Sequence, residues 1–233
     1  MGRKVFVSYK YADEKVAKLK DYFWEEVDGE FKFNWRKTRV RDYVDLLQEK
    51  IGIDNMNLGE KDSESLEDFS DQYIETELKR RIRQCSVTIV MISKGMKTIE
   101  QEKNQWIPWE ISYSLRTVPT GSYTKQMNAV LGIVLPDEYG TYDWYYRENP
   151  NCNSVTHFTG QLFKILRDNM FNIQDKVFRE CNGSKIHVTD EPSFIKTVKW
   201  EDFMTGNKYN DFIDKAIEIK NNKILYDVHI NLD

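Results

Sequence analysis

The segment from Val87 to Ser93 restricts the fold of this chain more than any other feature. It is an almost unbroken apolar, β-branched run, Val87-Thr88-Ile89-Val90-Met91-Ile92-Ser93, and therefore predicts a β-strand. A helix-like segment at 106–116 follows it. The same order of strand and helix recurs along the chain, which is typical of an α/β fold with a parallel sheet. We expect a central parallel sheet of about five strands, in the order 2-1-3-4-5, with helices on both faces.

The other elements are expected from periodicity and turn residues. Strands are predicted at 4–9, 31–35, 86–93, 128–135 and 194–199. Helices are predicted at 13–27, with Asp13 as its N-cap, and at 42–50, 66–83, 106–116, 160–170 and 209–220. We expect one domain, 1–233, with insertions near 36–65 and 136–158 and a C-terminal tail, 223–233, of some strand character.

Size and composition narrow the class of protein. The 233 residues suit one core, and 40% hydrophobic with 13% aromatic residues excludes wholesale disorder. The charged residues are of mixed sign with a net charge of −4, which argues against a nucleic-acid partner. The basic cluster 79–83 is expected to complement the end of a helix dipole. No signal-peptide core and no membrane-spanning apolar run occurs, so we expect a soluble, cytoplasmic protein without a membrane partner.

Several chemistries are disfavoured by what the sequence lacks. Cys85, Cys152 and Cys181 form no CxxC pair, so neither a disulfide framework nor a zinc site is predicted, and no metal is expected. The phosphate-binding patterns GxxxxGK[ST] and GxGxxG are missing, as are GxSxG and HExxH. The three histidines lie far apart, so acid–base chemistry would have to rest on carboxylates.

Glu110 is the carboxylate on which the functional interpretation depends. It lies in Trp106-Ile107-Pro108-Trp109-Glu110, at the start of the helix that follows the 86–93 strand. Ligands bind outside the carboxyl ends of strands in parallel α/β sheets. Ser8 and Tyr9, at the end of the first strand, are therefore expected to converge with Glu110 on one cleft, with Glu110 at its surface.

The segments around these residues resemble those of TIR domains. Val5-Phe6-Val7-Ser8-Tyr9 with Asp13 is similar to the first TIR box, and Trp106-x-x-x-Glu110 has the spacing found in NAD-consuming TIR domains. The stretches 40–45, 59–62 and 107–115 resemble the TIR-like branch that contains the bacterial Thoeris anti-phage proteins. The chain departs from many TIR domains in having Ile107-Pro108 where they carry a cysteine, and in its long loop after the second strand.

This resemblance implies a flavodoxin-like, three-layer fold and NAD as the substrate, with no dissociable cofactor. It implies that Glu110 is the catalytic glutamate for cleavage of the nicotinamide–ribose bond. Ser8, Tyr9 and Trp106 are implied to lie near the substrate. It further implies a cyclic ADP-ribose product that activates a separate effector protein, with self-association as a second kind of contact.

The chemistry is consistent with a single carboxylate. Breaking an N-glycosidic bond develops positive charge on the ribose, and a fixed carboxylate stabilises that charge. Nicotinamide leaves as a neutral amide and needs no acid. Aromatic side chains such as Tyr9 and Trp106 can stack on a flat, cationic ring.

Structural roles compete with these assignments. Glu110 could stabilise the positive end of its helix, and Ser8 could bond the local backbone. We expect Trp106 to line a pocket and Trp109 to pack in the core. The acidic residues Asp42, Asp45, Glu60 and Asp62 could ring the cleft or could be solvated loop charges.

Two other functions stay open at this level. One is a non-enzymatic TIR-type assembly module, and the other is an NAD hydrolase that acts by depletion. Cyclase and hydrolase share the first bond cleavage, so the sequence does not separate them.

Overall fold

The computed structural model describes residues 4–27, 29–52, 56–58, 71–121 and 123–232. Its centre is a parallel sheet of five strands in the order β4-β1-β5-β8-β13. These strands are Met56–Leu58, Val5–Ser8, Val87–Ile92, Ala129–Val134 and Lys196–Lys199. Counted along the chain, the order is 2-1-3-4-5, so the predicted α/β class and strand order are confirmed.

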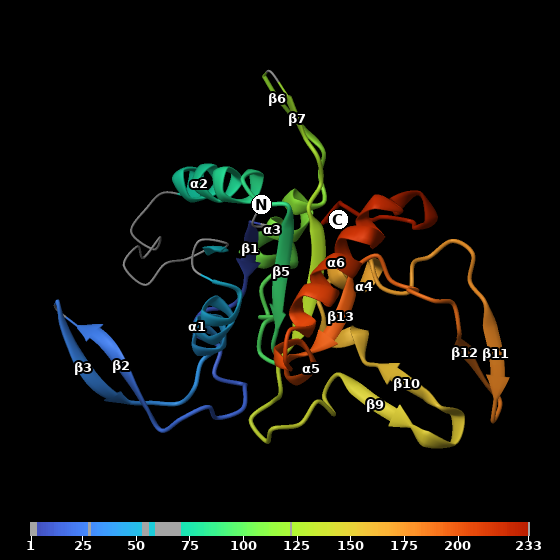
Figure 1. Cartoon of the computed structure of the whole chain (residues 1–233), viewed down its shortest axis with the longest axis horizontal. Coiled ribbons are helices and arrows are strands. Elements are labelled where there is room, and N and C mark those ends of the chain that lie inside the picture. The colour runs from blue at the N-terminus through green and yellow to red at the C-terminus, as the bar shows by residue number, and fades with distance from the viewer. Residues whose placement is uncertain (1–3, 28, 53–55, 59–70, 122, 233) are drawn as a thin grey trace.

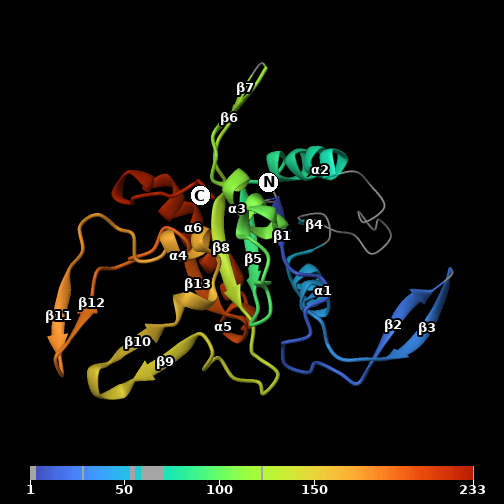
Figure 2. The ribbon, with the colours of Figure 1, turned by 180° about the vertical axis from the view of Figure 1, so that it is seen from behind.

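Helices cover both faces of this sheet and make three layers (Figure 1, Figure 2). On one face lie α1 (Val40–Ile51), α5 (Trp200–Met204) and α6 (Lys208–Asn221). On the other lie α2 (Asp71–Arg83), α3 (Trp106–Ser114) and α4 (Lys164–Asp168). Successive residues of a strand point to opposite faces of the sheet: Val5 and Val7 pack with α1, whereas Phe6 packs with α2. The predicted three-layer arrangement is confirmed.

In the described part of the chain, four antiparallel hairpins lie outside the central sheet. They are β2–β3 (Tyr22–Val27, Glu30–Trp35), β6–β7 (Val118–Thr120, Tyr123–Lys125), β9–β10 (Tyr146–Asn149, Ser154–His157) and β11–β12 (Phe178–Cys181, Ser184–His187). Short 3-10 helices occur at Glu102–Asn104, Pro150–Cys152, Thr159–Gln161 and Lys223–Leu225. Figure 1 shows the β2–β3 hairpin projecting away from the sheet beyond α1.

The predicted helix at 13–27 is wrong. Its second half is strand β2, and Asp13 caps no helix. The aromatic residues Tyr22, Phe23 and Trp24 favour a strand and pair with β3, which overrides the weaker helical spacing. The strand predicted at 31–35 is therefore a hairpin strand, and β4 is the second strand of the central sheet.

Three other segments differ in detail from expectation. The segment 36–65, predicted as an insertion, contains α1 and β4; its residues 53–55 and 59–65 are outside the described part, and its being an insertion stays a prediction. The helix predicted at 160–170 is divided into a 3-10 turn and α4, because Leu162 and Phe163 turn into the core between them. In the described part of the tail, 223–232, the only strand-like pairing is one bridge, Ile173 to Tyr226.

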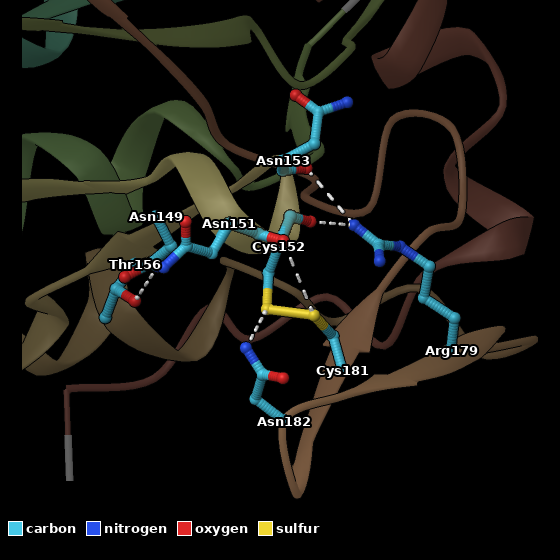
Figure 3. The surroundings of a disulfide bond; sticks show 8 residues. All are labelled: Asn149, Asn151, Cys152, Asn153, Thr156, Arg179, Cys181 and Asn182. Atoms are coloured by element: carbon cyan, nitrogen blue, oxygen red, sulfur yellow. Dashed lines mark hydrogen bonds between the residues drawn. A yellow bond between two sulfur atoms is a disulfide. The ribbon is translucent and has the colours of Figure 1, made fainter.

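The expectation that the chain has no disulfide is also wrong. Cys152 and Cys181 are bonded, with their Cα atoms 5.9 Å apart and a sequence separation of 29 (Figure 3). The bond joins the turn of the β9–β10 hairpin to the end of β11. Arg179 reinforces it by donating to the carbonyl oxygens of Cys152 and Asn153. Two separate hairpins bring these cysteines together, so their spacing gave no signal.

Residues on both sides of position 140 share one buried cluster. Val130 and Val134 of β8 pack with Phe163 and Leu166. The single-domain organisation stays a prediction. Among the described residues, no helix is long and apolar enough to cross a bilayer.

Candidate active site

The carboxyl ends of β1 and β5 form the edge of the sheet at which the predicted residues lie. β1 ends at Ser8, which is paired in register with Val90 of β5. Ser93 follows β5 directly, and the chain then leads into α3. Parallel strands end at the same edge, so the segments after β1 and β5 lie side by side.

Ser8 and Glu110 are in direct contact across this edge. The Ser8 Oγ hydroxyl donates a hydrogen bond of 2.5 Å to Glu110 Oε2, between residues 102 positions apart. Ser8 is 1% exposed and Glu110 is 6% exposed. A hydroxyl bonded to a carboxylate at this distance belongs to the strong, charge-assisted class. The expected convergence of these two residues is confirmed, but the expected position of Glu110 at a cleft surface is wrong, because it is buried.

The position of Glu110 in α3 does not favour a helix-dipole role. The first turn of α3 holds no acidic residue, and Glu110 lies in the second turn. The effect of the dipole on a charge falls off within the first turn. The hydrogen bond from the Ser8 hydroxyl therefore explains the presence of a carboxylate at position 110 better than the helix dipole does.

Two buried polar contacts fix α3 in place. At its C-terminus, Ser114 Oγ lies 2.8 Å from Thr88 Oγ1 of β5, and Asn128 Nδ2 donates to the same threonine. In its middle, Ser112 Oγ donates to the carbonyl oxygen of Ile230 at 2.6 Å. The C-terminal tail thus holds the helix two residues beyond Glu110, a contact that the sequence did not suggest.

The aromatic residues of α3 form a stack along the helix. Trp109 and Tyr113 are parallel with ring centroids 5.4 Å apart, and Trp106 meets Trp109 edge-on at 5.8 Å. Trp109 packs against the buried cluster that contains Phe6. Trp106 is 38% exposed, so it retains an open surface. The expected core role of Trp109 is confirmed, and a pocket role for Trp106 stays a prediction.

Tyr9 lies on the other side of the sheet from Ser8. Its ring packs against the cluster formed with α1, and its hydroxyl accepts a hydrogen bond of 3.1 Å from Arg41 Nη1. Successive residues of an extended chain point to opposite faces. The structure brings Ser8 to Glu110 and places Tyr9 against α1, so a substrate contact for Tyr9 stays a prediction.

A second polar cluster beside the site was missed by the sequence reasoning. Ser93 Oγ donates to Asp13 Oδ2 at 2.6 Å, and both residues are buried. Lys10 Nζ donates to the carbonyl oxygen of Gly95 at 2.8 Å. A Cβ on Gly95 would overlap the Asp13 carboxylate, so a larger residue there would displace that side chain. The sequence feature that could have indicated this cluster is Ser93-Lys94-Gly95, which follows the strand.

The acidic residues proposed to ring a cleft have other contacts. Asp42 is buried, accepts two hydrogen bonds of 2.8 Å from Arg36, and caps α1 by accepting from the backbone of Arg39. Asp45 pairs with Arg41. Both therefore stabilise α1. Glu60 and Asp62 lie outside the described residues.

The family of the chain follows from its sequence match. A family model described as the Thoeris protein ThsB, TIR-like domain, matches residues 6–139, more than half of the chain. This chain belongs to the Thoeris ThsB TIR-like domain family. The matched segment runs from β1 past the end of β8 and includes Ser8, Tyr9, Trp106 and Glu110. Membership supports a role in TIR-type defence.

Proposed function

We propose that this Thoeris TIR-like protein cleaves NAD at the nicotinamide–ribose bond, with Glu110 as the catalytic residue. The observation that carries the proposal is the 2.5 Å hydrogen bond from Ser8 to Glu110 at the carboxyl ends of β1 and β5. The bond fixes one oxygen of the carboxylate in position. Fixed charge of this kind stabilises charge that develops in a transition state.

The proposed reaction needs one carboxylate. As the glycosidic bond breaks, its electron pair leaves with nicotinamide and positive charge develops on the ribose, beside Glu110. Water then captures the ribose to give ADP-ribose and a proton, or a nucleophilic atom of the same molecule captures it to give a cyclic ADP-ribose and a proton. We favour the cyclic product, which would activate a separate effector protein. NAD is the substrate in this scheme, and no other cofactor or metal is invoked.

The burial of Glu110 makes activation part of the proposal. A carboxylate that is 6% exposed and bonded to Ser8 has little surface for a ribose. Neighbouring side chains must therefore move when NAD binds or when a trigger acts. This requirement agrees with a defence enzyme that stays silent in the cytoplasm until infection.

The test compares Glu110→Gln with wild-type protein. NAD is incubated with each, with and without extract of phage-infected cells, and products are resolved by mass spectrometry. Glu100→Gln, the same substitution at an exposed position before α3, is the matched control. We expect the triggered wild type and the control to release nicotinamide. Glu110→Gln should release it about 10²–10³-fold more slowly.

The products distinguish the alternatives. A cyclic product lighter than ADP-ribose by one water supports the cyclase, and ADP-ribose alone supports a hydrolase that acts by depletion. Full NAD cleavage by a folded Glu110→Gln protein would refute the catalytic assignment. Defence retained by that variant without any NAD cleavage would favour the assembly module.

A further inference from the structure

One face of the β2–β3 hairpin is almost entirely aromatic. In the antiparallel register, Tyr22 lies opposite Trp35 and Trp24 lies opposite Phe33. The alternation of side chains places Phe31 on the same face. The five side chains are 43–75% exposed. Four of the rings contact one another, with centroids 3.7 Å apart for Trp24 and Phe33 and 5.7 Å for Tyr22 and Trp35. We call this surface, formed by Tyr22, Trp24, Phe31, Phe33 and Trp35, the aromatic face.

On the opposite face of the hairpin Phe23 is covered, whereas Lys32 and Asn34 of β3 are exposed. Phe23 is 4% exposed there, with the Arg36 guanidinium 3.9 Å and the Lys20 ammonium 4.8 Å from its ring centroid. Within the described chain, β2 and β3 pair with each other and with no third strand. An isolated two-stranded hairpin is marginally stable in water unless a further layer packs on it. Among the described residues no such layer covers the aromatic face, whose side chains stay exposed.

We propose that the aromatic face packs against the same face of a second copy of this chain. A large aromatic side chain can bury 150–250 Å² of surface. The five side chains of the aromatic face are on average about three-fifths exposed, so each copy has about 600 Å² of aromatic surface available for an interface. Two copies would bury about 1,200 Å², the lower end of the range for specific interfaces. Offset and edge-to-face ring contacts across a two-fold axis would form the centre of this interface.

The charges of the hairpin favour an antiparallel arrangement of the two copies. The sequence from residue 25 to residue 30 includes four acidic residues, and we call it the acidic end of the hairpin. Lys20 and Lys37 lie where the hairpin joins the body, and Lys18 there is paired with Asp21. Strands of six residues separate these ends by about 20 Å. A two-fold axis across the aromatic face would place the acidic end of each copy near the lysines of the other. The acidic end also disfavours the alternative occupant, an anionic membrane surface.

The test is sedimentation velocity of the full chain across the micromolar range. We expect a monomer–dimer equilibrium for the wild type. Trp24→Ser and Trp35→Ser should each raise the dissociation constant about 30-fold or more, as buried interface tryptophans do. Tyr139→Ser, at an exposed aromatic position outside the hairpin, is the matched control and should leave the dissociation constant unchanged. Circular dichroism melts confirm that each variant is folded.

The orientation has its own test. Glu30→Lys should weaken the dimer several-fold at low salt, and the difference should shrink at high salt, where charges are screened. A tighter Glu30→Lys dimer would refute the antiparallel arrangement. A wild type that stays monomeric, or a dimer that survives both tryptophan substitutions, would overturn the proposal. Binding to anionic lipid vesicles by a monomeric wild type would identify the membrane as the occupant instead. None of these measurements depends on NAD cleavage.

Discussion

The Ser8 hydroxyl, at the end of the first strand, is hydrogen-bonded to the Glu110 carboxylate of α3 over 2.5 Å. Ser8 also pairs in register with Val90 of β5, the strand that precedes α3. The contact therefore joins the beginning of the chain to the helix that follows the third strand of the sheet. It gives the buried carboxylate a defined orientation, which both stability and activity measurements can detect.

Ser8→Ala should destabilise the fold by about 1–3 kcal/mol, because it leaves a buried carboxylate oxygen without this donor. Glu110→Gln should also lower stability measurably, since its amide cannot replace a charge-assisted bond. The measurement is urea unfolding of both single variants and the double variant. We expect clear non-additivity, because the two residues are in contact. Additive losses would mean that the hydrogen bond contributes nothing to stability.

Trp106→Ala should reduce activity and stability together. Loss of its edge-on contact with Trp109 should cost about 0.5–1.5 kcal/mol of unfolding free energy. If its open surface contacts the cationic nicotinamide ring, cleavage should fall roughly tenfold. Thermal melts and nicotinamide release by triggered protein measure the two effects. A lower melting temperature with unchanged cleavage would leave Trp106 as a packing residue alone.

His157 should make stability depend on pH. Burial lowers the pKa of His157 from 6.5 to about 4, among the rings of Tyr145, Tyr146 and Phe171. Below pH 6.5 the unfolded chain binds a proton that the folded chain does not, so stability is full above that pH and falls until about pH 4. The loss should reach about 2–3 kcal/mol.

His157→Phe should flatten much of this slope when unfolding is measured between pH 4 and 7. His187, whose pKa is also lowered, by burial and by Lys176, should leave a smaller slope of the same sign. An unchanged pH profile in His157→Phe would show that other groups set the acid stability of the protein.

The disulfide should stabilise the oxidised protein. In the chain-entropy account, closing a loop with a sequence separation of 29 contributes about 3.6 kcal/mol. Cys152→Ser and Cys181→Ser should therefore melt at lower temperatures than the wild type without reductant. With reductant, the wild type should approach the variants, which themselves should not respond. A wild type indifferent to reductant would show that the bond adds no stability.

Four of the five strands of the central sheet and the Ser8–Glu110 contact were predictable because they follow from local signals, whereas β4 was not predicted. Apolar runs such as Val87–Ile92 define strands, and parallel strand ends necessarily share an edge. The Trp106-to-Glu110 spacing then identified α3. The family match over residues 6–139 covers the same segments.

The errors have a different physical origin. Residues 13–27 carry helical spacing, but cross-strand contacts of Trp24 with Phe33 decide their conformation. The Cys152–Cys181 bond depends on how two hairpins lie relative to each other. The burial of Glu110 depends on the packing around α3. None of these relationships is expressed as a periodic pattern along the chain.

The position of β13 determines when the sheet can be completed during synthesis. β13 pairs with β8, although 61 residues separate Val134 from Lys196 in the chain. Ser8, β5, Glu110 and β8 all leave the ribosome before it does. The nascent chain can thus form the Ser8–Glu110 contact while the far edge of β8 is still open to other strands.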